Sequence, residues 1–153
     1  MGLITDLRVE AREWTQIRDL EAICMRALEA GFAGQINTDN AAVDVLLTDD
    51  DALAALNTQW RGKTGPTDVL SFPAEENPEA FLGDIAIAYG VATRDAVSGG
   101  KTITAHLSHL LVHGMLHLLG HDHIEDKEAE IMENLERAAL AKLGIADPYS
   151  QIV

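Results

Sequence analysis

The sequence predicts one α+β domain, residues 1–153, in which a mixed sheet of about four strands packs with about five helices. Its length of 153 residues is typical of a single domain. Hydrophobic residues make up 47% and charged residues 24% of the chain, a globular composition with enough apolar side chains for a core. An early strand followed by a helix, two neighbouring strands in the middle and helices at the end favour an α+β fold.

The first half of the chain predicts two strands and two helices from the spacing of its apolar residues. The strands are predicted at residues 3–10 and 41–48, the helices at residues 14–30 and 51–60, and a loop at residues 34–40. Gly31 is expected to stop the first helix. The acidic run that ends at Asp51 is typical of the start of the second.

The second half predicts two further strands and three helices. The strands are predicted at residues 69–72 and 82–89, a loop at residues 75–80, and the helices at residues 91–97, 103–119 and 125–143. Pro73 is expected to end the first of these strands. The stretch 103–120 contains no Asp, Glu, Lys or Arg, so we expect its helix to be central and either buried or lining a site.

The charge of the chain restricts its partners. Acidic residues outnumber basic ones 25 to 11, which gives a formal net charge of -14 and a pI near 4.6. The mean field therefore repels phosphate and opposes general adhesion to nucleic acid or to anionic lipid. A phosphate-bearing partner must be met by a local basic feature.

The sequence favours a cytoplasmic protein that does not enter the membrane. Cys24 is the one cysteine, so no intrachain disulfide can form, and its helical, apolar surroundings predict a small buried residue. The first residues lack the basic start and apolar run of a signal peptide. The charge-free stretch contains four histidines and a serine, which are costly in lipid.

All six histidines lie between residues 106 and 123. His113 and His117 are four residues apart in a predicted helix, so their side chains project from one face, one turn apart. Such a pair can grip a metal ion with bonds of about 2.0–2.1 Å. His106 and His109 share that face but lie about 10 and 6 Å from His113 along the axis, so we expect them to be supporting or core groups.

The third ligand has two candidates. Gly120 can end the helix and let the chain turn back, and by length alone either His121 or His123 could then reach the metal. Three neutral imidazoles leave one tetrahedral position for solvent, which is typical of a catalytic zinc site. Imidazole also suits nickel and other divalent ions.

The pattern from His113 to His117 resembles the HExxH helix of zinc hydrolases, with one departure. The position of the general-base glutamate is Gly114, so the usual peptidase mechanism lacks its proton acceptor. We expect Gly114 to leave space beside the metal for a bulky substrate.

Four ordered motifs resemble the YbeY family of bacterial metal-dependent endoribonucleases of ribosomal RNA maturation. HGMLHLLGHDH at residues 113–123 is similar to the family signature HGxLHLxGYDH, and LNTQWR at 56–61 to its LNxxYR element. PTDVLSFP at 66–73 and LGDI at 82–85 resemble its TDVLSFP and GDI segments, and EAEIME at 128–133 its final helix. The departures are Trp60 and His121, which stand where the family has tyrosine.

The resemblance implies zinc, one ion per chain, at His113, His117 and His123, and a functional arginine at Arg61. It favours His123 over His121. It implies single-stranded or ribosomal RNA as substrate, including the 3′ end of 16S rRNA, a role in ribosome quality control, and components of the small ribosomal subunit as partners. The planar guanidinium of Arg61 suits bidentate binding of phosphate. Lys63, Arg94 and Lys101 would extend a basic track.

Two rival functions remain open from the residues. One is a metal-dependent hydrolase of a peptide or small ester that shares the histidine site. The other is a non-catalytic, ribosome-associated module in which zinc serves stability. Because of the net charge, we expect free RNA to bind weakly and with strong salt sensitivity, through a small basic groove or through delivery by ribosomal components.

Overall fold

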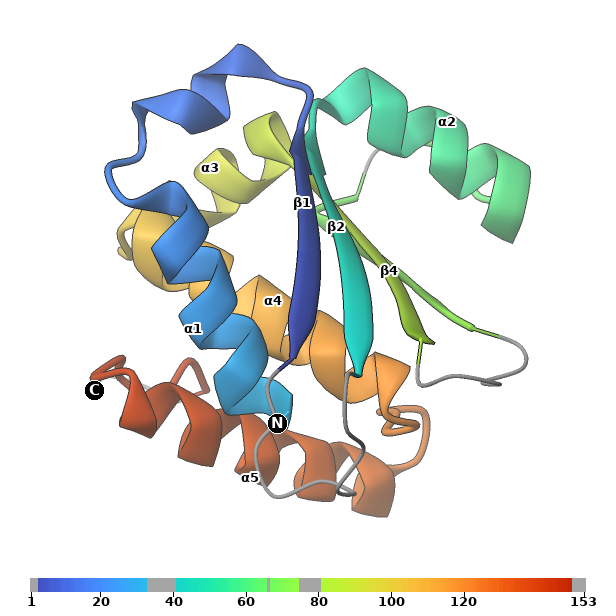
Figure 1. Cartoon of the computed structure of the whole chain (residues 1–153). Coiled ribbons are helices and arrows are strands. Elements are labelled where there is room, and N and C mark those ends of the chain that lie inside the picture. Colours follow the sequence, from blue (N-terminus) through green and yellow to red (C-terminus); the bar gives the residue numbers. More distant parts are fainter. Residues whose placement is uncertain (1–2, 33–40, 66, 75–80, 150–153) are drawn as a thin grey trace.

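A mixed four-stranded sheet forms the centre of the computed structural model, which describes residues 3–32, 41–65, 67–74 and 81–149 (Figure 1). The strands are β1 (Ile4–Val9), β2 (Ala42–Thr48), β3 (Val69–Pro73) and β4 (Phe81–Ala88). Their order is β1-β2-β4-β3; β1, β2 and β4 are parallel, and β3 runs antiparallel to β4. The predicted α+β fold with a mixed sheet is confirmed.

The described residues also form five α-helices and one short 3-10 helix. They are η1 (Arg12–Gln16), α1 (Leu20–Phe32), α2 (Asp50–Arg61), α3 (Tyr89–Ser98), α4 (Ile103–Leu118) and α5 (Asp126–Lys142). The carboxylate of Asp49 caps α2 by accepting from the backbone N–H of Ala52, and the hydroxyl of Thr102 caps α4 by accepting from Ala105. All four strands and the last four helices end within two residues of the predicted bounds.

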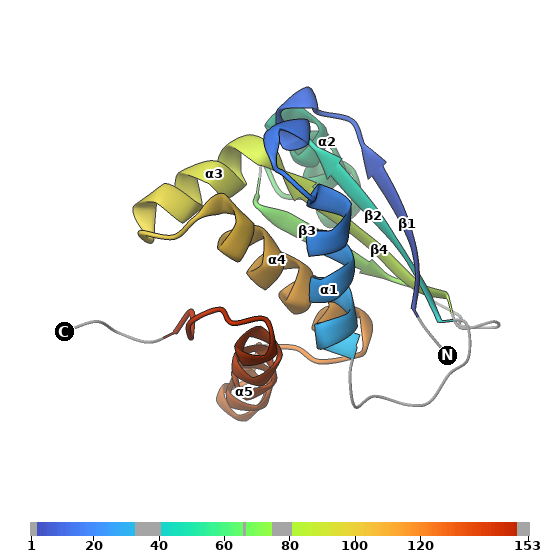
Figure 2. The ribbon, with the colours of Figure 1, turned by 60° about the vertical axis from the view of Figure 1, so that its left-hand side comes forward.

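The sheet separates two apolar layers because the side chains of each strand alternate between its faces. Val45 of β2 and Ile85 of β4 point into the larger core, which α1 and α4 cover. Leu46 and Ala86, their neighbours in sequence, point to the other face and pack with α2. Figure 2 shows α1 and α4 on one side of the strands and α2 on the other.

The predicted helix at residues 14–30 is wrong at its start, and its expected stop at Gly31 is also wrong. Trp14 lies in η1, fully buried, and its indole N–H donates to the carbonyl oxygen of Thr48 at 2.9 Å. Asp19 has a φ of 58°, which breaks the helical path before α1 begins at Leu20. Gly31 does not stop the helix; a Cβ there would lie 3.2 Å from Cβ of Met115, so the glycine allows α1 to approach α4 closely.

Three further predictions have different outcomes. The loops at residues 34–40 and 75–80 lie outside the described residues. Cys24 is buried as expected, and its burial raises the pKa of the thiol to about 12. Within the described residues, no helix is both long and apolar enough to cross a membrane.

Candidate metal centre

The turn after α4 brings the end of the histidine-rich segment back to the helix. Gly120 has a φ of 102°, a conformation that glycine adopts without strain. The backbone N–H of His121 then donates to the carbonyl oxygen of Leu116 at 3.0 Å, which closes the turn. Residues 121–123 are thereby directed along the last turn of α4 rather than away from it.

Three histidines meet at this turn. One ring nitrogen each of His113, His117 and His123 lies within 4.8 Å of the other two. The Nε2 atoms of His113 and His117 are 3.1 Å apart. The ring of His123 lies 5.4 Å from that of His113 and 5.1 Å from that of His117, centroid to centroid. This spacing fits one ion with bonds of about 2.0–2.1 Å to imidazole nitrogens.

His123, rather than His121, joins the pair on α4. Within the described part of the chain, the group of possible ligands contains His123 and not its neighbour two residues earlier. The carboxylate of Asp122 accepts a hydrogen bond from the backbone N–H of His123 at 2.7 Å. Asp122 therefore stabilises the turn through the backbone.

A buried carboxylate on α5, that of Glu136, contacts the ring nitrogen of His113 that points away from the other two histidines. Oε2 of Glu136 lies 2.9 Å from Nδ1 of His113, and its Oε1 lies 2.7 Å from Nε2 of His109 and accepts the hydroxyl of Tyr149 at 2.5 Å. With Nδ1–H of His113 directed to Glu136, Nε2 keeps its lone pair for the shared centre. A metal-ligating histidine is normally oriented by a carboxylate in this way.

Burial and neighbouring groups shift the pKa values of Glu136 and His117. Burial acts to raise the pKa of Glu136, but the hydrogen bonds from His109, His113 and Tyr149 outweigh it and lower the pKa to about 2. Burial, together with the charges of His113 and His123, lowers the pKa of His117. A neutral imidazole is the form that binds a metal ion.

Sequence reasoning missed Glu136, although the chain carries a signal for it. The residues of α5 that face the core are Met132, Glu136, Ala139 and Leu140, and Glu136 is 1% exposed. An acidic residue within an apolar helical stripe needs a partner. The partners are the histidines of α4, and His109 is the supporting group that the spacing predicted.

The expectation that Gly114 leaves space for a substrate is wrong. A Cβ at Gly114 would lie 3.1 Å from side-chain carbons of Ile85 and 3.1 Å from Oγ of Ser71. The residue is buried against β3 and β4, on the side of α4 that faces the sheet. A glutamate at this position would therefore point into the core and not toward the histidines.

Arg61 is not part of the histidine group. It is the last residue of α2, which packs on the opposite face of the sheet from α4, and its side chain is exposed. Among the described residues, no hydrogen bond or ion pair involves its guanidinium. The preceding Trp60 is 64% exposed and stands edge-on to Phe72 of the outer strand β3, with ring centroids 6.4 Å apart.

Two hollows lie on opposite faces of the sheet. A cavity of about 260 Å³ is lined by His113, His123, Glu136 and Tyr149 with parts of α5. A larger one of about 420 Å³, beside α2, is lined by Trp60, Phe72 and three aspartates that are paired across neighbouring strands, Asp6, Asp44 and Asp84. Arg8 also lines this larger hollow, and both hollows contain carboxylates; the smaller one contains two of the three candidate metal ligands, His113 and His123.

The chain is similar to a known family over nearly its whole length. The family model described as Endoribonuclease YbeY matches residues 8–144. A protein named Endoribonuclease YbeY from Rhodopseudomonas palustris strain BisB18 is 47% identical over 154 residues, covering 95% of this chain and 92% of that protein. The protein of the same name from Rhizobium meliloti is 44% identical over 160 residues, covering 97% and 95%.

A solved structure has the same fold. The solution structure of TM1509 from Thermotoga maritima is similar with a TM-score of 0.56 and 25% sequence identity, covering 97% of this chain and 100% of that one. The α+β fold is therefore shared by a protein of similar length.

Proposed function

We propose, because this chain belongs to the YbeY family of endoribonucleases, that it cuts single-stranded RNA at a metal ion held by His113, His117 and His123. The observation that carries the proposal is the meeting of three ring nitrogens within 4.8 Å, one of the rings being held by a buried carboxylate. The donor set of three imidazoles fits Zn²⁺.

Zn²⁺ bound there would act as a Lewis acid on water and on a phosphoryl oxygen. The protein's own residues prepare the site for it. Glu136 fixes the tautomer and orientation of His113, and Tyr149 in turn donates to Glu136. The lowered pKa of His117 favours its neutral imidazole, which is the form that binds a metal ion.

Arg61 is proposed to bind the phosphate of the same RNA strand. Its exposed guanidinium follows the exposed indole of Trp60, and a guanidinium beside an aromatic surface suits a phosphate next to an unstacked base. Because α2 and α4 lie on opposite faces, one strand would reach both by crossing the edge strand β3. Arg94, once a candidate for the same track, is paired with Asp50 at 2.9 Å.

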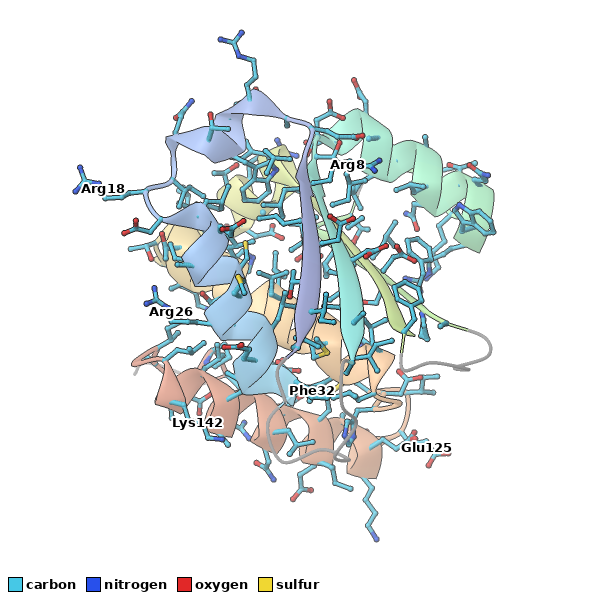
Figure 3. All side chains as sticks on the ribbon, viewed as in Figure 1. Arg8, Arg18, Arg26, Phe32, Glu125 and Lys142 are labelled. Carbon is cyan, nitrogen blue, oxygen red and sulfur yellow. The ribbon has the colours of Figure 1, made fainter. Side chains whose placement is uncertain are left out.

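The biological substrate is proposed to be ribosomal RNA, including the 3′ end of 16S rRNA, in maturation and ribosome quality control in the cytoplasm. The net charge of -14 supports delivery by small-subunit components over capture of free RNA. Figure 3 shows two arginines, Arg18 and Arg26, that point away from the molecule on the side of α1, opposite to Glu125 at the start of α5.

Because an acidic chain holds RNA only through a few local basic groups, binding to free single-stranded RNA should weaken steeply as salt rises.

The decisive experiment is cleavage of single-stranded RNA by zinc-loaded wild type, His117→Ala and Arg61→Ala, each checked for folding and metal content. We expect His117→Ala to lose both metal and cleavage. Arg61→Ala should keep the metal but bind the RNA about 10–100-fold more weakly and cleave it less at limiting RNA, because a hydrogen bond to a charged group contributes roughly 1.5–3 kcal/mol. Arg18→Ala is the matched control and should cleave like wild type. Retained cleavage by both site variants would contradict the proposal.

The two rival functions predict other outcomes in the same assays. A peptide hydrolase would cleave casein, which the buried position of Gly114 disfavours because no glutamate can act as base from there. A non-catalytic zinc module would tolerate Arg61→Ala without loss and would unfold when the metal is removed.

A further inference from the structure

A second cluster of metal-binding side chains lies near the other end of α4. Asp68 directly precedes β3, Asp95 lies in α3, and His106 lies near the start of α4. One ligand atom of each lies within 4.8 Å of the other two. The three residues come from separate parts of the chain, so the tertiary fold, rather than a local sequence motif, brings them together. None of them belongs to the centre formed by His113, His117 and His123.

The imidazole of His106 lacks a partner in this cluster. The residue is 9% exposed, both ring nitrogens are buried, and neither has a hydrogen-bond partner among the described residues. Buried polar groups in folded proteins are nearly always satisfied, and an unsatisfied one requires an explanation. A neutral imidazole has one lone pair, and a cation between it and the two carboxylates would use that lone pair.

The two carboxylates lie close to each other. Burial, the neighbouring charge of Asp68 and a hydrogen bond with Asp68 raise the pKa of Asp95, whereas the charges of His106 and Arg94 act to lower it. Asp68 is held in place, because its Oδ1 accepts the backbone N–H of Val69 at 2.8 Å. Two aspartates close together beside an imidazole form a site in which a divalent cation balances the charge.

The nearby basic side chains do not fill this role. The guanidinium of Arg94 is 2.9 Å from the carboxylate of Asp50 and is thereby engaged elsewhere. Lys101 lies near enough to contribute to the lowered pKa of His106. Within the described residues, however, no ion pair joins Lys101 to Asp68 or Asp95.

We propose that Asp68, Asp95 and His106 form a second metal site, which binds one Zn²⁺ and ties the start of β3 to α3 and α4. One imidazole and two carboxylates suit a transition-metal ion, whereas Mg²⁺ and Ca²⁺ prefer oxygen ligands throughout. Bonds of about 2.0–2.2 Å to one ion span the separation of these atoms after a small movement of the exposed Asp95 side chain.

The test measures Zn²⁺ binding to the full chain with the histidine centre removed. In the variant His117→Ala/His123→Ala, equilibrium dialysis against Zn²⁺ should find one equivalent per chain, and Zn²⁺ should raise the melting temperature. Adding Asp95→Asn should remove that equivalent and the shift in melting temperature. Asp51→Asn, at an exposed aspartate in the first turn of α2, is the matched control and should retain both.

A residue-level measurement guards against binding elsewhere. In the same background, imidazole ¹⁵N spectra should show the ring of His106 shifting as the single equivalent of Zn²⁺ is added, and Mg²⁺ should cause no such shift. Absence of a bound equivalent, its persistence after Asp95→Asn, or an unchanged His106 ring would overturn the second site. None of these results depends on RNA cleavage, so the proposed function stands or fails separately.

Discussion

The two sides of α4 differ in what they do, although their residues alternate in the sequence. His113 faces α5, where its ring meets Glu136, and Gly114 faces the sheet, where a Cβ would lie 3.1 Å from Ile85. The side toward the sheet is close-packed. The side toward α5 carries a row of imidazoles with hydrogen-bond partners and access to a cavity of about 260 Å³.

Substitutions on the two sides of α4 should therefore affect different properties of the protein: its stability on the side of the sheet, and metal binding and cleavage on the side of α5. Changes toward the sheet should damage the fold first, because close-packed interiors accept little extra volume and no unpaired charge. Changes toward α5 should damage metal binding and cleavage first and the fold less, because the histidines there are half-buried or exposed. Four substitutions test that separation.

Gly114→Glu should have the largest effect. It restores the HExxH spacing, but places a carboxylate against Ile85 and Ser71 instead of near the metal ligands. We expect a loss of about 3–5 kcal/mol in the free energy of unfolding, the cost of an uncompensated buried charge. Urea denaturation measures it.

Gly114→Ala is the matched control for this change. The added methyl requires Ile85 to move by a few tenths of an ångström, while alanine gains about 1 kcal/mol of helix propensity over glycine, so its effect should be small. If Gly114→Glu folds like wild type and cleaves casein, the assignment of this position to the sheet side is wrong.

His123→Ala should have the next largest effect, and on the other side of the helix. We expect RNA cleavage to fall by more than about 100-fold, because loss of a ligand costs more than the roughly 10–100-fold cost of losing a supporting partner. The melting temperature of the metal-free protein should not change, because His123 is exposed. His121→Ala, two residues away, should cleave like wild type; the opposite order of the two variants would make His121 the third ligand.

The same difference explains which parts of the fold could be predicted. Strand and helix positions follow from apolar spacing, so nearly all of them were found. The segment after Trp14 was not, because a helical spacing of apolar residues does not reveal that Asp19 adopts a positive φ or that the indole is needed to bond Thr48. The indole bond depends on Thr48 of β2, which lies 34 residues further along the chain.

The site could be predicted where its residues share one helix turn. His113 and His117 were found from their spacing, but His121 and His123 were equal by length until the turn at Gly120 was known. Glu136 comes from another helix, and no spacing links it to α4. The space expected at Gly114 was wrong because the sequence does not say which side of α4 meets the sheet.

Glu136→Gln should weaken the site without removing a ligand. Glutamine keeps the shape but loses the negative charge that orients His113 and stabilises it in the metal-bound state. We expect metal affinity to fall by about 10–100-fold, with a smaller loss of cleavage at saturating Zn²⁺. Competition with a chromophoric chelator measures the affinity.

Glu130→Gln is the matched control on α5. Glu130 is exposed and does not line the hollow that holds His113, His123 and Glu136. Its metal affinity should equal that of wild type. An equal loss of metal affinity in both variants would mean that the ion is held by the general negative charge of α5 rather than by the specific contact between Glu136 and His113.

Tyr149→Phe should have the smallest effect and shows how far the supporting network extends. The hydroxyl of Tyr149 donates to Oε1 of Glu136 at 2.5 Å, and the ring stands edge-on to His109 with centroids 5.7 Å apart. Phenylalanine keeps the ring contact and removes the donor, so the free energy of unfolding should fall by about 0.5–1.5 kcal/mol. Metal affinity should change less than in Glu136→Gln, because His113 and His109 still hold the carboxylate. A loss as large as that of Glu136→Gln would mean that Tyr149, rather than the histidines, fixes the position of Glu136.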